Sequence, residues 1–108
     1  MLLFLNSACG ACRRFADELR SDRGRELVAQ IRLTVVTDAT GADAFVDLDT
    51  SGVGAQEHGE AVTALGIPAT PYGVAIAVGG AVLAADLVAD LDSLYGLAGV
   101  LRSQPVSA

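Results

Sequence analysis

The two cysteines of the chain, Cys9 and Cys12, are separated by two residues and are the side chains best suited to chemistry. They follow an apolar run at residues 2–5 and precede a helix-compatible pattern, which predicts a strand-to-helix junction. The first N–H groups of a helix have no intrahelical partner and, with the aligned peptide dipoles, favour an anion. A thiolate at Cys9 would be that anion, and the thiolate is the reactive form of cysteine.

The spacing gives each sulfur a different role. Cys9 is expected at the mouth of the helix and Cys12 about one turn deeper, so Cys9 can attack a disulfide and Cys12 can displace the mixed disulfide. So short a loop removes little chain entropy, which makes the pair a poor structural crosslink. Arg13 and Arg14 are interpreted either as a solvated helix face or as support for the thiolate and a docking site for an acidic partner, with Arg13 the better candidate.

Composition narrows the classes of partner. The chain has 108 residues and a formal net charge of -6, and arginine supplies all of its basic side chains. An acidic surface argues against nucleic acid and anionic lipid as partners. No apolar run approaches the roughly 20 residues that a membrane-spanning helix needs, so no membrane contact is expected from this domain.

A helix is predicted from about residue 10 to residue 20, around the second cysteine. Asn6 and Ser7 are expected to supply its N-cap oxygens, and Gly24 is expected just past its end. Residues 25–29 are a candidate helical continuation. The predicted core-facing stripe consists of Ala11, Phe15 and Leu19.

The β-branched residues 32–37 predict a second strand. With the strand at 2–5 and the helix between them, they form a βαβ unit, in which the two strands are parallel and the crossover is right-handed. Residues 42–48 are a candidate amphipathic helix, and 61–65 a candidate short helix ended by Gly66. The first of these is predicted to turn inward Ala42, Phe45, Val46 and Leu48.

The C-terminal part predicts a hairpin and a helix. Two β-compatible runs, 73–78 and 81–84, flank a glycine pair and favour a β-hairpin. A helix is predicted over about 90–102, which closes a single domain of residues 1–102, and 103–108 are predicted to be a frayed tail. The buried stripe predicted for this helix is Leu91, Leu94, Tyr95, Ala98 and Leu101.

This order of strand, CxxC, helix, strand, X-Pro-led hairpin and closing helix resembles the thioredoxin-like superfamily, especially the TlpA/redoxin-type thiol–disulfide oxidoreductases. The resemblance covers nearly the whole chain, firmly at residues 2–20 and 66–102. It implies an α/β fold with a central mixed β-sheet flanked by helices on both faces. It also implies a redox-active Cys9–Cys12 pair that exchanges with protein thiol/disulfide partners and needs no external cofactor and no metal.

The family also has a cis proline packed against the CxxC, preceded by a residue that pairs through its backbone with the bound peptide. Pro71 lies eight residues before the hairpin turn at Gly79, which is the family's usual spacing, whereas Pro68 falls three residues too early. The resemblance therefore assigns the cis proline to Pro71 and substrate pairing to Thr70.

The chain departs from thioredoxins proper at three places. Ala8 stands where the family usually has Trp before the first cysteine, and Leu3 stands where it has a buried carboxylate that helps to move the second thiol's proton. Proton transfer at Cys12 is therefore left to water or another group. The dipeptide between the cysteines, Gly10-Ala11, replaces Gly-Pro and tunes the reduction potential.

Two other classes of function compete with the oxidoreductase. Copper chaperones also place a CxxC between a first strand and a first helix, which makes a Cu(I) or soft-metal binding module one alternative. A thioredoxin-like interaction domain without turnover is the other. A tetrahedral zinc site wants four ligands, and His58 is the chain's only histidine; it is interpreted as a solvated loop residue.

The compartment follows from the resemblance alone. Family analogy favours an extracytoplasmic location, periplasmic or cell-surface, with the domain anchored in a longer precursor. A cytoplasmic reductant is the alternative if that precursor carries no anchor or signal.

Overall fold

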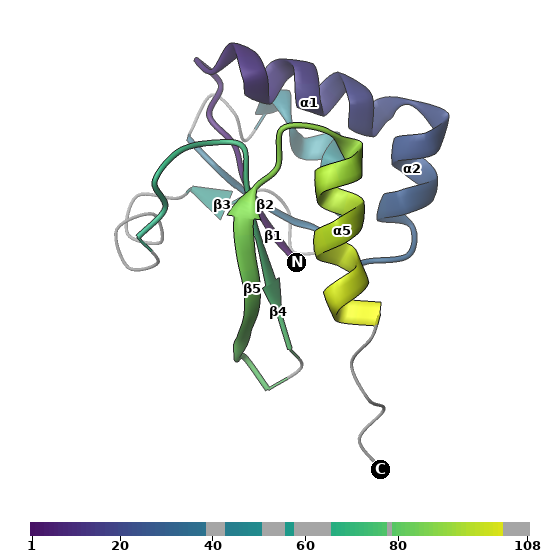
Figure 1. The fold of residues 1–108 in the computed structure, drawn as a ribbon. Helices are drawn as coiled ribbons and strands as arrows, with labels where there is room; N and C mark the ends of the chain where they lie inside the picture. Colours follow the sequence, from purple (N-terminus) through teal and green to yellow (C-terminus); the bar gives the residue numbers. More distant parts are fainter. Residues whose placement is uncertain (39–42, 51–55, 58–65, 78, 103–108) are drawn as a thin grey trace.

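The computed structural model describes residues 1–38, 43–50, 56–57, 66–77 and 79–102 (Figure 1). Within these residues the strands form one mixed sheet in the order β3-β2-β1-β4-β5. The strands are β1 (Leu2–Phe4), β2 (Thr34–Thr37), β3 (Gln56–Glu57), β4 (Tyr72–Ile76) and β5 (Val82–Leu87). The α-helices are α1 (Gly10–Arg20), α2 (Asp22–Val28) and α5 (Leu91–Arg102), and a 3₁₀ turn, η1, covers Val46–Leu48.

Strand β1 lies at the centre of the sheet and fixes the direction of its neighbours. It runs parallel to β2, with Leu3 opposite Val35, and antiparallel to β4, with Leu3 opposite Gly73. The parallel β1–α1–β2 unit confirms the strand directions predicted from the sequence. Because the carboxyl ends of parallel strands meet at one edge of a sheet, the loop after β1 lies beside the loop after β2.

The predicted hairpin is confirmed as β4 and β5, which pair antiparallel. Its turn contains Gly80 at a φ of 91°, a conformation that glycine adopts without a steric penalty. The second strand is longer than the predicted 81–84, since β5 continues to Leu87. That extension carries the chain back toward the cysteine end of the sheet, where the Val88 N–H donates to the Pro71 carbonyl oxygen at 3.0 Å.

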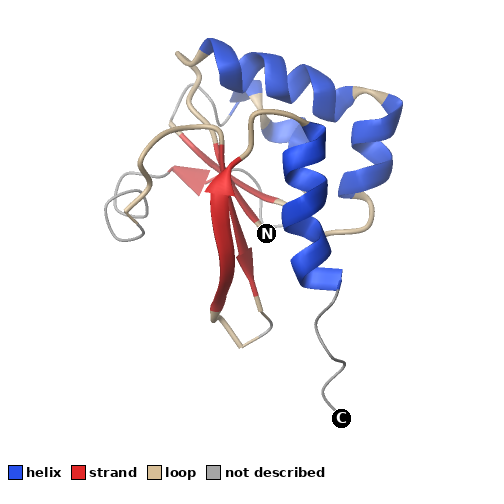
Figure 2. Cartoon of the chain, viewed as in Figure 1, coloured by secondary structure: helices blue, strands red, loops and turns tan. Residues whose placement is uncertain are grey.

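The main hydrophobic core lies between the three α-helices and one face of the sheet (Figure 2). Leu3, Val35 and Ala75 contribute to it from the strands, and Phe15 and Leu94 contribute from α1 and α5. A smaller cluster forms on the opposite face around Phe4, Val36 and Val74. The described α-helices thus cover one face, and the expectation of helices on both faces stays a prediction.

Helix α1 has the predicted bounds, but its buried stripe begins one residue later than predicted. Its buried side chains are Cys12, Phe15, Ala16 and Leu19, whereas Ala11 is only half-buried. The reason is helical periodicity: positions 12, 15, 16 and 19 follow the i, i+3, i+4, i+7 rule, and position 11 lies about 80° away from position 19. The second cysteine is therefore part of the core.

The sequence predicted that Gly24 lies just past the end of the first helix, and this prediction is wrong. Ser21 interrupts the helix for one residue, and its hydroxyl oxygen then accepts the Gly24 N–H at 3.2 Å as the N-cap of α2. Gly24 lies inside α2 where the two helices touch. A Cβ added there would lie 2.3 Å from the Glu18 carbonyl oxygen and 2.5 Å from the Leu19 Cα. Glycine is needed for this close approach and not for a positive φ.

Two predicted inward side chains point outward instead. Val46 in η1 is 55% exposed, because the segment forms a 3₁₀ turn that buries Phe45 and Leu48 on its inner side. In α5, Tyr95 is 55% exposed and Leu97, which the predicted stripe omitted, is buried. Leu97 reaches the sheet at Gly73, since a Cβ added to that glycine would lie 2.6 Å from Leu97 Cδ2.

Several predictions fall on residues outside those that the structure describes. They concern the inward position of Ala42, the short helix at 61–65, the solvated position of His58 and the tail at 103–108. Among the described helices, none has the length and apolar character required to cross a membrane.

Candidate functional site: a dithiol at the start of helix α1

Cys9 is the N-cap residue of α1. Its backbone is extended, with φ -87° and ψ 117°, and its Sγ accepts the Cys12 N–H at 3.3 Å. The sulfur thus satisfies one of the helix's orphan N–H groups, which places it where negative charge is stabilised. The predicted capping oxygens act elsewhere: Asn6 Oδ1 accepts the Ala8 N–H at 2.8 Å, and Ser7 bonds to Asp38.

Cys12 is held differently, although it is only one turn away. It is fully buried within the main core cluster, whereas Cys9 is half-buried. Its Sγ accepts the backbone N–H of Asn6 at 3.4 Å. Both cysteines are free thiols in this structure. A disulfide partner arriving from solvent therefore meets Cys9 first.

The two environments separate the pKa values of the two thiols. Burial acts to raise the pKa of Cys9, but hydrogen bonds from the Cys12 thiol, the Cys12 N–H and Thr70 outweigh it and lower that pKa below its ordinary value. Burial raises the pKa of Cys12 to about 11, against hydrogen bonds with Thr70 and the Asn6 N–H, and the nearby Cys9 charge adds to the rise. Cys9 is the better thiolate, and Cys12 keeps its proton.

Thr70 and Pro71, which the family resemblance assigns to the site, lie on the side of the Cys9 sulfur that faces the hairpin segment. The Cys9 thiol donates to the Thr70 carbonyl oxygen, with 3.7 Å between the two atoms, although 61 residues separate them in sequence. Pro71 is buried directly after Thr70, and the peptide bond between them is cis, the isomer expected at this proline. The structure therefore brings together Cys9, Cys12 and Thr70, with Pro71 attached to the last of them.

The supporting residues occupy the first turn of α1. Gly10 and Ala11 are its first two residues, and Arg13 is exposed, with Nη1 3.5 Å from the Ser7 carbonyl oxygen. Against the effect of burial, the groups that lower the pKa of Cys9 are hydrogen-bond partners: the Cys12 thiol, the Cys12 backbone, Thr70 and the Ala11 backbone. Electrostatic support of the thiolate by Arg13 stays a prediction.

Asp38 is the site residue that the sequence analysis missed. Its carboxylate accepts the Ser7 N–H at 2.9 Å, the Ser7 hydroxyl and the Thr37 hydroxyl at 3.0 Å. The bonds from the Ser7 hydroxyl and N–H, aided by Thr37 and opposed by burial, lower the Asp38 pKa to about 2. A signal was present: Asp38 directly follows β2, the parallel neighbour of β1, so it had to lie beside the loop that carries the cysteines.

The surroundings of Cys12 are apolar where the family resemblance expects an acid. Leu3 is fully buried and belongs to the same core cluster as Cys12. The described polar neighbours of the Cys12 sulfur are the Asn6 N–H, Cys9 and Thr70. None of these three is a carboxylate. The position at which the family has a buried acidic side chain is occupied by the apolar side chain of Leu3.

No protein-family model, curated protein or solved structure matches this chain. In the part of the chain that the structure describes, no three His, Cys, Asp or Glu side chains lie close enough to hold a metal ion together. The fold and the site define a mixed α/β protein with a free dithiol at a strand-to-helix junction.

Proposed function

We propose that the chain is a thioredoxin-like thiol–disulfide oxidoreductase that exchanges electrons between Cys9–Cys12 and the disulfides of protein partners. The observation that carries the proposal is the asymmetry of the two sulfurs. Cys9 is half-buried, caps a helix and has a lowered pKa, whereas Cys12 is fully buried with a pKa raised by burial to about 11. Exchange in two steps needs one activated thiol and one held in reserve.

In the first step the Cys9 thiolate attacks one sulfur of the partner disulfide. A bond forms between Cys9 and that sulfur, the partner's S–S bond breaks, and its second sulfur leaves as a thiolate. In the second step Cys12 loses its proton and attacks the Cys9 sulfur. The Cys9–Cys12 disulfide forms, the partner leaves with both sulfurs reduced, and two electrons have passed to it.

The second step needs a thiolate at Cys12, and the first step helps to produce it. Burial is the main reason that the Cys12 pKa is high, and the negative charge at Cys9 is a further reason. Once Cys9 is part of a mixed disulfide, that charge is gone, so the pKa of Cys12 falls toward the range in which water can take the proton. With Leu3 in the core, solvent is the proposed acceptor.

The proposed fold family is supported by the arrangement of the elements. The parallel β1–α1–β2 unit carries the dithiol, and the antiparallel β4–β5 hairpin brings Thr70 against Cys9. Helix α5 then covers the same sheet face as α1. The burial of Cys12 weighs against a Cu(I) module, because a metal site made of two thiolates needs both sulfurs accessible and Cys12 is fully buried.

A redox titration of the purified, metal-free protein in defined glutathione buffers tests the proposal, with free thiols counted at each ratio. We expect reversible equilibration of one disulfide, at a potential that lies between roughly −270 and −120 mV. Failure to equilibrate would indicate an interaction domain without turnover. Thiols that stay protected until a chelator is added would indicate the metal module.

Serine variants test the two roles. Cys9→Ser is expected to lower the rate of reduction of a protein disulfide by at least about a thousandfold, because the nucleophile is lost. Cys12→Ser is expected to accumulate a covalent mixed disulfide with the partner, detectable by its mass, because the resolving thiol is lost. Normal turnover by Cys12→Ser would show that the roles are wrongly assigned.

A further inference from the structure

Arg13 and Arg14 lie about one turn after Cys9, the N-cap of α1, and both side chains reach back toward the start of the helix. Arg13 Nη1 lies 3.5 Å from the Ser7 carbonyl oxygen, in the loop that precedes the helix. A Cβ added to Gly10, between the two cysteines, would lie 3.5 Å from Arg14 Nη1, so the Arg14 guanidinium lies over Gly10. This direction follows from helix geometry, since side chains tilt toward the N-terminus.

These two guanidinium groups differ from those of Arg20 and Arg23, which form ion pairs. Arg20 pairs with Asp17 and Asp47, and Arg23 pairs with Asp92. Within the described ranges no carboxylate lies within ion-pair distance of Arg13 or Arg14, and both side chains are exposed. Two exposed cations without a described ion pair thus lie about one turn after Cys9, in a chain of net charge -6, and such a pair attracts anionic groups at short range.

The remaining described groups around Cys9 offset only part of the positive charge of the two arginines. Asp38 contacts the loop through Ser7 and, with its pKa lowered to about 2 by the hydrogen bonds that it accepts, brings one negative charge against two positive ones. Across the sulfur, Thr70 and Pro71 are uncharged, and Ala8 beside Cys9 offers no charge either. The described surroundings of Cys9 therefore combine uncharged groups at Thr70 and Pro71 with two exposed arginines on α1.

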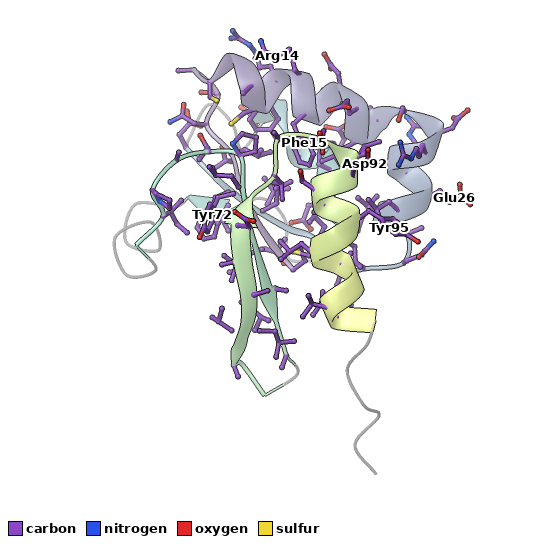
Figure 3. The ribbon with its side chains drawn as sticks, viewed as in Figure 1. Arg14, Phe15, Glu26, Tyr72, Asp92 and Tyr95 are labelled. Carbon is purple, nitrogen blue, oxygen red and sulfur yellow. The ribbon has the colours of Figure 1, made fainter. Side chains whose placement is uncertain are left out.

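Figure 3 shows Arg14 on the outer side of α1 and Phe15 on the inner side, toward the sheet. The two arginine side chains therefore lie outside the core and are exposed to solvent. Arginine presents a planar fork of donors that matches a carboxylate. The arrangement fits an anionic group carried next to the incoming disulfide.

We propose that Arg13 and Arg14 form a cationic rim that selects protein disulfides flanked by carboxylate side chains. The proposal rests on the oxidoreductase function and adds its partner class. The covalent steps are those given above: the rim accelerates the encounter and orients the partner sulfur toward Cys9, and it takes no part in bond making. Electrostatic selection of this kind acts mainly on the association rate and weakens with salt.

Three peptides of equal length, each closed by one disulfide, test the rim. They differ only in the residues that flank one cysteine, which are Glu, Gln or Lys. The reduced protein is mixed with each peptide, and each rate is divided by the rate of dithiothreitol with the same peptide to remove intrinsic differences in disulfide reactivity. We expect the Glu peptide to be reduced about tenfold faster than the Lys peptide at low ionic strength.

Two double variants of equal net charge then locate the effect. In Arg13→Gln/Arg14→Gln the preference is expected to fall to about twofold or less, and about 0.5 M salt should reduce the wild-type preference in the same way. The matched control is Arg25→Gln/Arg32→Gln, which removes two exposed arginines from α2 and from the residue stretch before β2. The control should keep the wild-type preference. An equal loss in both variants would overturn the rim and indicate a general charge effect.

A neutral disulfide separates failure of the rim from failure of the function. If wild-type protein reduces bis(2-hydroxyethyl) disulfide but treats the three peptides alike, the rim is wrong and the oxidoreductase stands. If it reduces no disulfide, the proposed function fails and the rim fails with it. If only glutathione disulfide becomes slower in Arg13→Gln/Arg14→Gln, the rim binds a small anionic thiol compound and the protein-partner class is overturned.

Discussion

The two ends of α1 are built from opposite kinds of contact. At its N-terminal end two sulfurs are held by backbone hydrogen bonds, with Cys9 Sγ 3.3 Å from the Cys12 nitrogen and Cys12 Sγ 3.4 Å from the Asn6 nitrogen. At its C-terminal end α2 packs so closely that Gly24 has no room for a Cβ beside the Glu18 carbonyl oxygen. We call the N-terminal end, where Cys9 is half-buried, the open end. We call the C-terminal end, where backbone atoms of α1 and α2 touch, the closed end.

This contrast separates the part of α1 that carries stability from the part that carries thiol chemistry. A sulfur that exchanges partners must be able to give up its hydrogen bonds, and contacts from single N–H groups permit that. Backbone atoms in direct contact cannot move apart without separating the helices. Changes at the closed end should therefore cost stability and spare thiol chemistry, and changes at the open end should do the reverse.

Gly24→Ala gives the largest expected effect. The new methyl would overlap the backbone of α1, so we expect a loss of about 3 kcal/mol or more in the free energy of unfolding. Urea denaturation followed by circular dichroism measures it. In the protein that remains folded, Cys9 should alkylate at the wild-type rate.

The matched control for that substitution is Gly96→Ala in α5. A Cβ at this position meets no atom within 4 Å, so alanine should raise stability by about 0.5–1 kcal/mol through its better helix propensity. Equal stability changes at positions 24 and 96 would disprove the close contact between α1 and α2.

The pH dependence of alkylation tests the open end. The pKa of Cys9 is lowered chiefly by hydrogen bonds that outweigh burial, so its thiolate forms below the ordinary value of 9.0 and disappears as pH falls through the lowered pKa. The Cys12 pKa, raised by burial to about 11, keeps that thiol protonated at neutral pH. We expect Cys9 in Cys12→Ser to react with iodoacetamide at pH 7 at least about tenfold faster than Cys12 in Cys9→Ser.

The pH profile of Cys12 alkylation in Cys9→Ser provides a second test. Removing Cys9 removes one cause of the raised Cys12 pKa, but burial, the largest cause, stays. The midpoint for Cys12 should therefore remain above 9.0. Coinciding midpoints for the two variants would contradict the asymmetry on which the proposed function rests.

Asp38→Ala is expected to cost less stability than Gly24→Ala and tests the hydrogen bonds that hold the loop before Cys9. The loop loses the acceptor of the Ser7 N–H, so we expect a loss of about 1 kcal/mol. Hydrogen bonds from Ser7, aided by Thr37, lower the Asp38 pKa from 3.8 to about 2, so its contribution is present above pH 3.8 and is lost as pH falls toward 2. Below about pH 2 the difference in stability between the variant and the wild type should be smaller than at about pH 5, because the charged form of Asp38 is lost.

Asp38→Asn is the companion variant, since an amide oxygen can still accept the Ser7 N–H. It should recover part of the stability and should also recover the Cys9 alkylation rate, if Asp38 acts by positioning the loop. A Cys9 rate that is unchanged in Asp38→Ala would show that the Asp38 contact does not position the dithiol.

Sequence periodicity predicted an element correctly where the residues of that element alone determine its bounds. The bounds of α1 agree with the prediction, and the hairpin was signalled by two β-compatible runs around glycines. Periodicity gave wrong predictions where packing against a neighbouring element determines which side chains of a helix face inward. Leu97 is buried and Tyr95 exposed because Gly73 leaves space on the sheet for the leucine, which no pattern within α5 could reveal.

The dithiol and its place at the start of a helix could be predicted from the sequence alone, because both depend on residue type and short-range spacing. The position of the cis proline at Pro71 was implied by the family resemblance, and the structure has the cis bond there. The tertiary structure decided which sulfur is open and which is closed. It also decided that Thr70 and Asp38 meet the loop, because both reach it through strand pairing across the sheet. Burial and long-range hydrogen bonds set the reactivity of a thiol, and both arise only when distant segments pack together.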